Sequence, residues 1–135
     1  MQRNMELIRQ ILFYIEGEYK AGSGNSLGTE EITIFLADYP QFQGINQDVV
    51  YEHCDLMYHA GLMKTINTST MDECSFLIGN LTNNGFDLLD KIRSDTAWNT
   101  TKTIIADNGL PMTLEVIIGV ASKVMADMLS GVLQS

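Results

Sequence analysis

The sequence predicts a mostly helical α+β protein, and three observations lead to this class. First, residues 47–60 carry a helical apolar stripe that stops at Gly61. Second, two short segments with alternating apolar residues follow, Leu62–Ile66 and Cys74–Leu81. Third, the rest of the chain has mainly helical periodicity. This order is typical of a winged-helix core with a small β-hairpin wing, here at Asn67–Glu73, and we expect two further C-terminal helices.

The first third of the chain contains one helix and one ambiguous segment. Asn4–Glu16 is predicted to be a helix because four apolar residues recur every three or four positions, namely Met5, Ile8, Leu12 and Ile15. Residues 17–28 are rich in Gly, Ser and Asn, which indicates a loop. In Thr29–Pro40, alternating Ile32, Ile34 and Leu36 favour a short strand, and one or two helical turns are the alternative. Pro40 ends either element.

The central helix has signals at both ends. Asn46 is the expected N-cap, and Asp48 in the first turn suits the positive end of the helix dipole. His53 lies on the side that carries the apolar stripe, where we expect it to be half-buried. Gly61 predicts a left-handed stop.

The remaining helices follow from similar signals. Thr82 is the expected N-cap of the helix NNGFDLLDKIRS. The next helix is expected to begin at Asp95 or Thr96 and to close at Asn108-Gly109. Pro111 is expected to open the last helix, because proline suits a first turn.

The last helix has the most regular pattern of the chain. Its apolar residues step by four and three as in a heptad seam, namely Leu114, Ile118, Ala121, Met125, Met128 and Val132. This pattern predicts either core packing alone or core packing with a homodimer contact through Leu114, Ile118, Met125 and Met128. We expect a single domain overall. Residues 1–109 would form a core with an appended helix, and residues 110–135 would pack on that core or on a second subunit.

Composition limits the class of partner. The chain has 135 residues with 17 acidic and 8 basic side chains, and its net charge is −9. An acidic protein is a poor match for nucleic acid phosphates and for anionic membranes. Two cysteines and a start that lacks a signal-peptide pattern predict a reduced, cytoplasmic protein.

Enzymatic motifs are absent from the sequence. It contains no glycine-rich phosphate loop, nucleophile elbow or zinc-protease pair. His53 and Cys54 are neighbours, so on a helix they point about 100° apart and cannot form a nucleophile–base pair by themselves. A metal site from Cys54, Cys74 and a histidine stays open, although it has no recognised spacing. We expect no catalytic residue, no metal and no cofactor.

Four phrases of the chain resemble an uncharacterised family of bacterial, phage and prophage proteins, domain of unknown function 2513. They are MELIRQILFYIE, VVYEHCDLMYHAGLM, TSTM and LTNNGFDLLDKIRSDTAWNTTK, and together they cover nearly the whole chain. Family members typically carry a helix ending AGLI, then LTWEGHEFLD, then Arg-Asp-Asp-Thr-x-Trp-Asn-x-x-Lys. Asn83, Asn84 and Phe86 depart from the family's Trp, Glu and His, so any role of that histidine is lost.

The resemblance implies a winged-helix variant in a phage or prophage setting, and it brings no established activity. Its most specific phrases are Leu81-Thr82 with Gly85, and Asp95-Thr96 with Trp98-Asn99. The second phrase, with Lys102, is a candidate surface. The structural alternative is stronger: Trp98 would be a core anchor, and Asp95 and Thr96 would cap the helix.

The central helix carries the main candidate for partner binding. Between Ala21 and Met63 there is no Lys or Arg, and Asp48, Glu52 and Asp55 form one acidic stripe. Such a stripe would be repelled by DNA phosphates. With Tyr51 and Tyr58 it predicts a protein-binding surface, and in a phage protein such a surface suggests mimicry of nucleic acid to inhibit a host system. A solvated face without a function is the plain alternative. The other functional alternative is a DNA-binding transcriptional regulator, with Lys91, Arg93 and Lys102 touching the DNA backbone.

Overall fold

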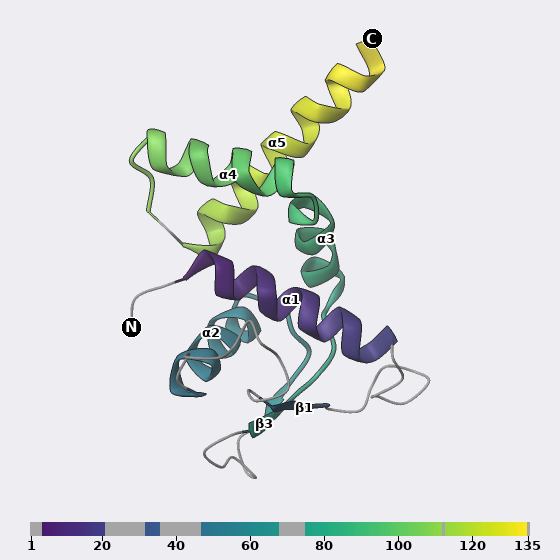
Figure 1. Ribbon diagram of the computed structural model, residues 1–135, viewed down its shortest axis with the longest axis vertical. Helices are drawn as coiled ribbons and strands as arrows, with labels where there is room; N and C mark the ends of the chain where they lie inside the picture. Colours follow the sequence, from purple (N-terminus) through teal and green to yellow (C-terminus); the bar gives the residue numbers. More distant parts are fainter. Residues whose placement is uncertain (1–3, 21–31, 36–46, 68–74, 112, 135) are drawn as a thin grey trace. The chain divides into compact units, whose positions relative to one another are not determined.

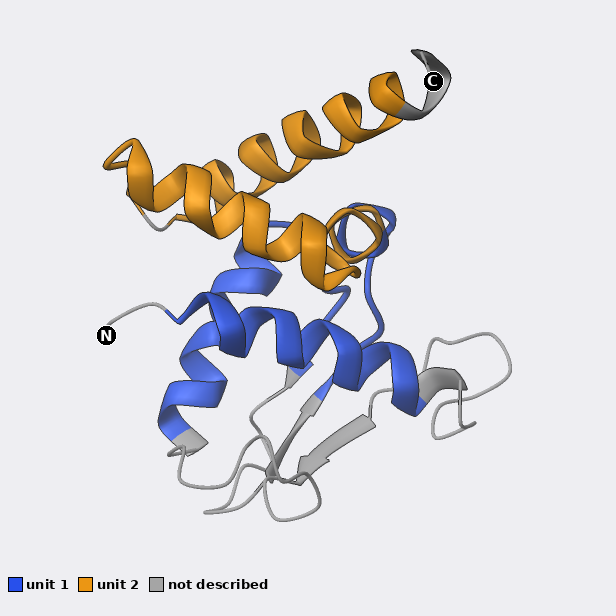
Figure 2. Cartoon of the chain, turned by 45° about the horizontal axis from the view of Figure 1, so that its top comes forward, with its two compact units in different colours: residues 1–86 blue, residues 87–135 orange. Residues whose placement is uncertain are grey.

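The chain forms two compact units. The computed structural model describes residues 4–20, 32–35, 47–67, 75–111 and 113–134. Unit 1 is Met1–Phe86 and unit 2 is Asp87–Ser135, shown in blue and orange in Figure 2. The expected boundary near residue 109 stays a prediction.

Unit 1 contains two complete helices and three short strands (Figure 1). The helices are α1 (Met5–Lys20) and α2 (Gln47–His59). The strands are β1 (Ile32–Phe35), β2 (Ile66–Asn67) and β3 (Ser75–Ile78). They form an antiparallel sheet in the order β1-β3-β2, in which Ile78 pairs with both Ile32 and Ile66.

The core of unit 1 is built mainly from helices. The predicted stripe of α1 is confirmed, because Met5, Ile8, Leu12 and Ile15 are all at most 5% exposed. Buried residues of α1 also include Leu7, Ile11 and Tyr14, so this helix buries more than one narrow stripe. Helix α2, which packs against α1, contributes Val50, Cys54 and Met57.

Hydrogen bonds join the turn after α2 to the start of α3 (Asn83–Ile92). Gly61 ends α2 in the left-handed conformation that was expected, with φ of 80°. The Thr82 amide donates to the Leu62 carbonyl, and the Thr82 hydroxyl donates to the Gly61 carbonyl over 2.5 Å. The same hydroxyl accepts a hydrogen bond from the Gly85 amide, which confirms Thr82 as the N-cap.

Unit 2 contains the rest of α3, α4 (Asp95–Asp107) and α5 (Leu114–Gln134). Helices α4 and α5 pack against each other. The N-cap of α4 is Ser94, whose hydroxyl accepts from the Ala97 amide, so the expected capping by Asp95 or Thr96 is wrong. Helix α5 begins at Leu114 rather than at Pro111, because the Thr113 hydroxyl accepts from the Val116 amide.

The predicted fold class, α+β with a winged-helix core and a β-hairpin wing, is wrong. Five helices dominate the described chain, and the strands have only four, two and four residues. Helices supply the core, and so short a sheet does not form a layer of its own. Of the expected wing, only Asn67 lies within the described residues. Within that part of the chain, no helix is both long and apolar enough to cross a membrane.

The close approach at Gly85 generates a prediction about stability. A Cβ atom on residue 85 would lie 2.2 Å from the Leu62 carbonyl oxygen, so Gly85→Ala forces the backbone apart. We expect it to lower the free energy of unfolding by about 1–3 kcal/mol, as overpacking does. Gly17 is the matched control, because it lies in α1 with open space around it. Gly17→Ala should raise stability by about 0.5–1 kcal/mol. Equal effects in urea unfolding would contradict this account.

Candidate interaction surfaces

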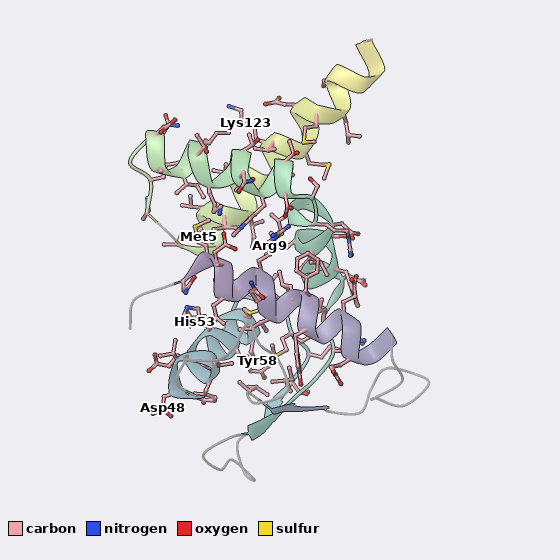
Figure 3. The ribbon with its side chains drawn as sticks, viewed as in Figure 1. Met5, Arg9, Asp48, His53, Tyr58 and Lys123 are labelled. Carbon is pink, nitrogen blue, oxygen red and sulfur yellow. The ribbon has the colours of Figure 1, made fainter. Side chains whose placement is uncertain are left out.

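The acidic face of α2 consists of Asp48, Glu52 and Asp55, with Tyr51 and Tyr58 beside them. Asp48 and Glu52 are exposed, and Asp55 and Tyr51 are half-buried. Tyr58 is exposed at 39%, whereas the other two tyrosines with described exposure, Tyr14 and Tyr51, are buried and half-buried. Residues four and three apart adjoin on a helix, so Asp55 lies next to both tyrosines as well as Glu52. Figure 3 shows Asp48 and Tyr58 toward opposite ends of α2.

One histidine lies beside this face. The His59 Nδ1 atom lies 3.3 Å from the Asp55 carboxylate and 2.9 Å from its carbonyl oxygen. The rings of Tyr58 and His59 meet edge to face, with centroids 5.3 Å apart. The end of α2 therefore presents the Asp55 carboxylate together with the rings of Tyr58 and His59.

His53 and Cys54 are both buried on the apolar side of α2. His53 is 0% exposed, more deeply buried than expected, and both of its ring nitrogens are hydrogen-bonded. Cys54 is also 0% exposed, and burial, followed by the charge of Asp55, raises the pKa of its thiol far above the usual range. A thiol in this state is not a nucleophile at neutral pH.

The described residues give no support to the metal site that was considered for Cys54, Cys74 and a histidine. The described residues hold no group of three or more His, Cys, Asp or Glu side chains arranged to bind a metal ion. Cys74, the second cysteine of that hypothetical site, lies outside the residues that the structure describes.

The candidate motif surface on α4 divides into buried and exposed members. Trp98 is 2% exposed, so its ring belongs to the interior and not to a contact surface. The Lys102 ammonium lies over this ring, 5.5 Å from its centroid, which indicates a cation–π contact. Asp95 and Asn99 are exposed. The polar residues of this motif therefore surround a tryptophan that packs in the protein interior.

The candidate dimer residues lie on α5 at different depths. The buried row is Ile117, Ala121 and Val124, one position away from much of the expected seam. Leu114, Ile118 and Met125 are half-buried. Beyond them Met128 is 40% and Leu129 54% exposed. Helix α5 has 21 residues and α4 has 13, so α5 is longer by about 12 Å at 1.5 Å per residue. Figure 1 shows its C-terminal part extending past α4.

The three basic residues considered for DNA binding make contacts inside unit 2. The Lys91 ammonium donates to the Ser122 hydroxyl over 2.9 Å, and this hydroxyl donates to the Ile118 carbonyl. The Arg93 guanidinium lies 3.0 Å from the Asp90 carboxylate. Lys102 covers Trp98. Each of these cations therefore already has a partner inside unit 2.

Sequence reasoning missed several of these contacts. Ser94 and Thr113 each stand directly before a helix, a local signal that would have identified them as caps. The bonds from Lys91 to Ser122 and from His53 to Asn4 join residues 31 and 49 positions apart, so no local pattern contains them.

Comparison with known proteins places the chain in a family. Residues 2–111 match the family described as hypothetical protein DUF2513, so the chain belongs to this family. It is also similar to an uncharacterized protein of Haemophilus influenzae, with 36% identity over 130 residues. That alignment covers 96% of this chain and 100% of the relative. No solved structure matches the chain.

The burial of Cys54 generates a prediction about reactivity. In a Cys74→Ser background, Cys54 is the one remaining thiol. We expect an aromatic disulfide reagent to modify it at least about 100-fold more slowly in the native protein than in denaturant, because reaction requires an opening of the core. Rapid modification without denaturant would show that Cys54 is accessible and would contradict the packing of α2.

Proposed function

We propose that this protein is a non-enzymatic accessory factor that binds another protein through the acidic face of α2. The observation that carries the proposal is the exposure of Asp48, Glu52 and Tyr58 along one helix that contains no Lys or Arg. Exposed carboxylates speed and orient association with a positively charged partner. An exposed tyrosine on the same helix provides the apolar contact area that protein interfaces favour.

The partner that fits this face is a basic protein surface. We propose a nucleic-acid-binding channel of a host enzyme, which the carboxylates would occupy in place of phosphates, so that the protein inhibits a host system. This fits the phage or prophage setting that the sequence resemblance implies, in the host cytoplasm. The net charge of −9 also favours association with a positively charged partner.

A DNA-binding transcriptional regulator is the second candidate, and the charges argue against it. Lys91, Arg93 and Lys102 already contact Ser122, Asp90 and Trp98. If these three side chains turned toward DNA, their present contacts would be broken. The two functions differ in salt dependence: DNA binding weakens by about one logarithmic slope unit per neutralised phosphate, whereas a mixed apolar and acidic protein contact weakens gently.

The first test of the proposal is a charge-neutral variant of the acidic face of α2. In the triple variant Asp48→Asn, Glu52→Gln and Asp55→Asn, we expect capture of the partner protein from a lysate of the encoding organism to fall by about tenfold or more. The amount captured is measured by quantitative mass spectrometry against the wild-type chain.

The matched control removes three carboxylates elsewhere. Asp87, Asp107 and Asp127 are exposed and lie on α3, α4 and α5. Neutralising them to Asn also changes the net charge from −9 to −6, and it should leave capture unchanged. Equal loss in both triples would mean that only overall charge matters, and unchanged capture in the α2 triple would rule out this face.

We also propose self-association through the end of α5, because Met128 and Leu129 are exposed where the buried row ends. A glutamate at Met128 should shift the protein toward monomer in light scattering across a concentration series, because a charge in an apolar contact is unfavourable. Ser130→Glu, at a neighbouring exposed polar position, is the control and should have little effect. A wild-type protein that is monomeric at every concentration would exclude the dimer.

A further inference from the structure

His53 ties two helices together with both of its ring nitrogens. Its Nδ1 lies 2.8 Å from the Val49 carbonyl oxygen, which only accepts, so Nδ1 must carry a hydrogen. Its Nε2 lies 2.8 Å from the Asn4 backbone nitrogen, which only donates, so Nε2 must present a bare lone pair. The geometry therefore assigns one state to the ring, the neutral tautomer with hydrogen on Nδ1.

The residue on the other side of this bond begins α1. The Asn4 side-chain oxygen accepts from the Leu7 amide, and the Asn4 carbonyl accepts from the Ile8 amide. Asn4 is thus the N-cap of α1, and its own amide points at His53 on α2. Figure 3 shows His53 on the side of α2 that is turned toward the first turn of α1.

We propose that this contact is a proton-sensitive latch between the start of α1 and α2. A proton on Nε2 would replace the acceptor with a second donor, so that two N–H groups face each other at a ring that is 0% exposed. The Asn4 amide then loses its acceptor, and a positive charge on a fully buried ring has no partner in this bond, which is unfavourable. Acidification therefore releases the first turn of α1 from α2.

The charged groups on the elements packed around His53 do not restore the bond. The first turns of α1 contribute Glu6 and Arg9, and Arg9 lies over the Phe13 ring, 5.0 Å from its centroid. Helix α2 contributes Asp48, Glu52 and Asp55, and the first two of these are exposed to water. Strand β2, which also packs on α2, consists of Ile66 and Asn67 and carries no charge. Carboxylates can attract a proton to this region, whereas the acceptor observed for the Asn4 amide is the Nε2 atom of His53.

The test compares the full chain with a variant that does not titrate. In His53→Gln, the side-chain amide can place an oxygen near the former Nε2 position, so an acceptor for Asn4 is kept. Between about pH 7.5 and about pH 5.5, the wild-type urea midpoint should fall, because a proton on Nε2 removes the acceptor for the Asn4 amide. The limiting effect of one proton is about tenfold in the unfolding equilibrium constant per pH unit. His53→Gln should lose this dependence. His59→Gln, which removes the exposed histidine of the same helix, should keep it.

Nitrogen NMR of the histidine rings provides a readout that does not depend on any variant. At neutral pH the wild-type His53 ring should show hydrogen on Nδ1 and none on Nε2. On acidification, protonation of Nε2 should coincide with a large shift of the Asn4 amide signal. A neutral ring with hydrogen on Nε2, or an Asn4 signal that does not follow the protonation of His53, would overturn the latch. The latch would also be overturned if the urea midpoints of the wild type and of a folded His53→Gln variant depended equally on pH.

Discussion

The Leu62 carbonyl oxygen approaches Gly85 so closely that a side chain on residue 85 would not fit. A Cβ atom built on this residue would lie 2.2 Å from that oxygen. The same carbonyl accepts from the Thr82 amide, and the Thr82 hydroxyl joins the Gly61 carbonyl to the first turn of α3. The exit from α2 and the entry to α3 are thus held together by backbone atoms and by the Thr82 hydroxyl, at a point where residue 85 has no room for a side chain. The direction in which the chain continues after α2 depends on this joint.

Several family phrases are explained by such structural roles. Leu81 is buried, Thr82 caps α3, and Gly85 permits the close approach. Trp98 is buried under Lys102, and the helix that carries it is capped by Ser94. By contrast, Asp48 and Glu52 lie exposed on α2, on the side away from the core that the same helix helps to form. A helix that the fold already requires can present a variable outer face without loss of stability, and this is why we assign binding to that face.

The sequence allowed local features to be predicted, and it failed where distant residues meet. The stripe of α1, the stop at Gly61 and the cap at Thr82 each depend on a few neighbouring residues, and all three are confirmed. The mixed fold class was wrong because short alternating segments say little about how much of the core a sheet supplies. The deep burial of His53 depends on Asn4, 49 residues away, which no pattern within α2 reveals. The acidic face could be located from spacing alone, whereas the engagement of Lys91 by Ser122 could not.

The claim on which the functional account depends is that the partner is a protein and not a nucleic acid. The most direct measurement is affinity capture from a lysate of the encoding organism, performed with and without nuclease and read by mass spectrometry. The account predicts a stoichiometric protein, rich in basic surface, that is retained after nuclease treatment. Recovery of nucleic-acid-binding proteins that disappear on nuclease treatment would contradict it, and would show that the protein associates with DNA or RNA.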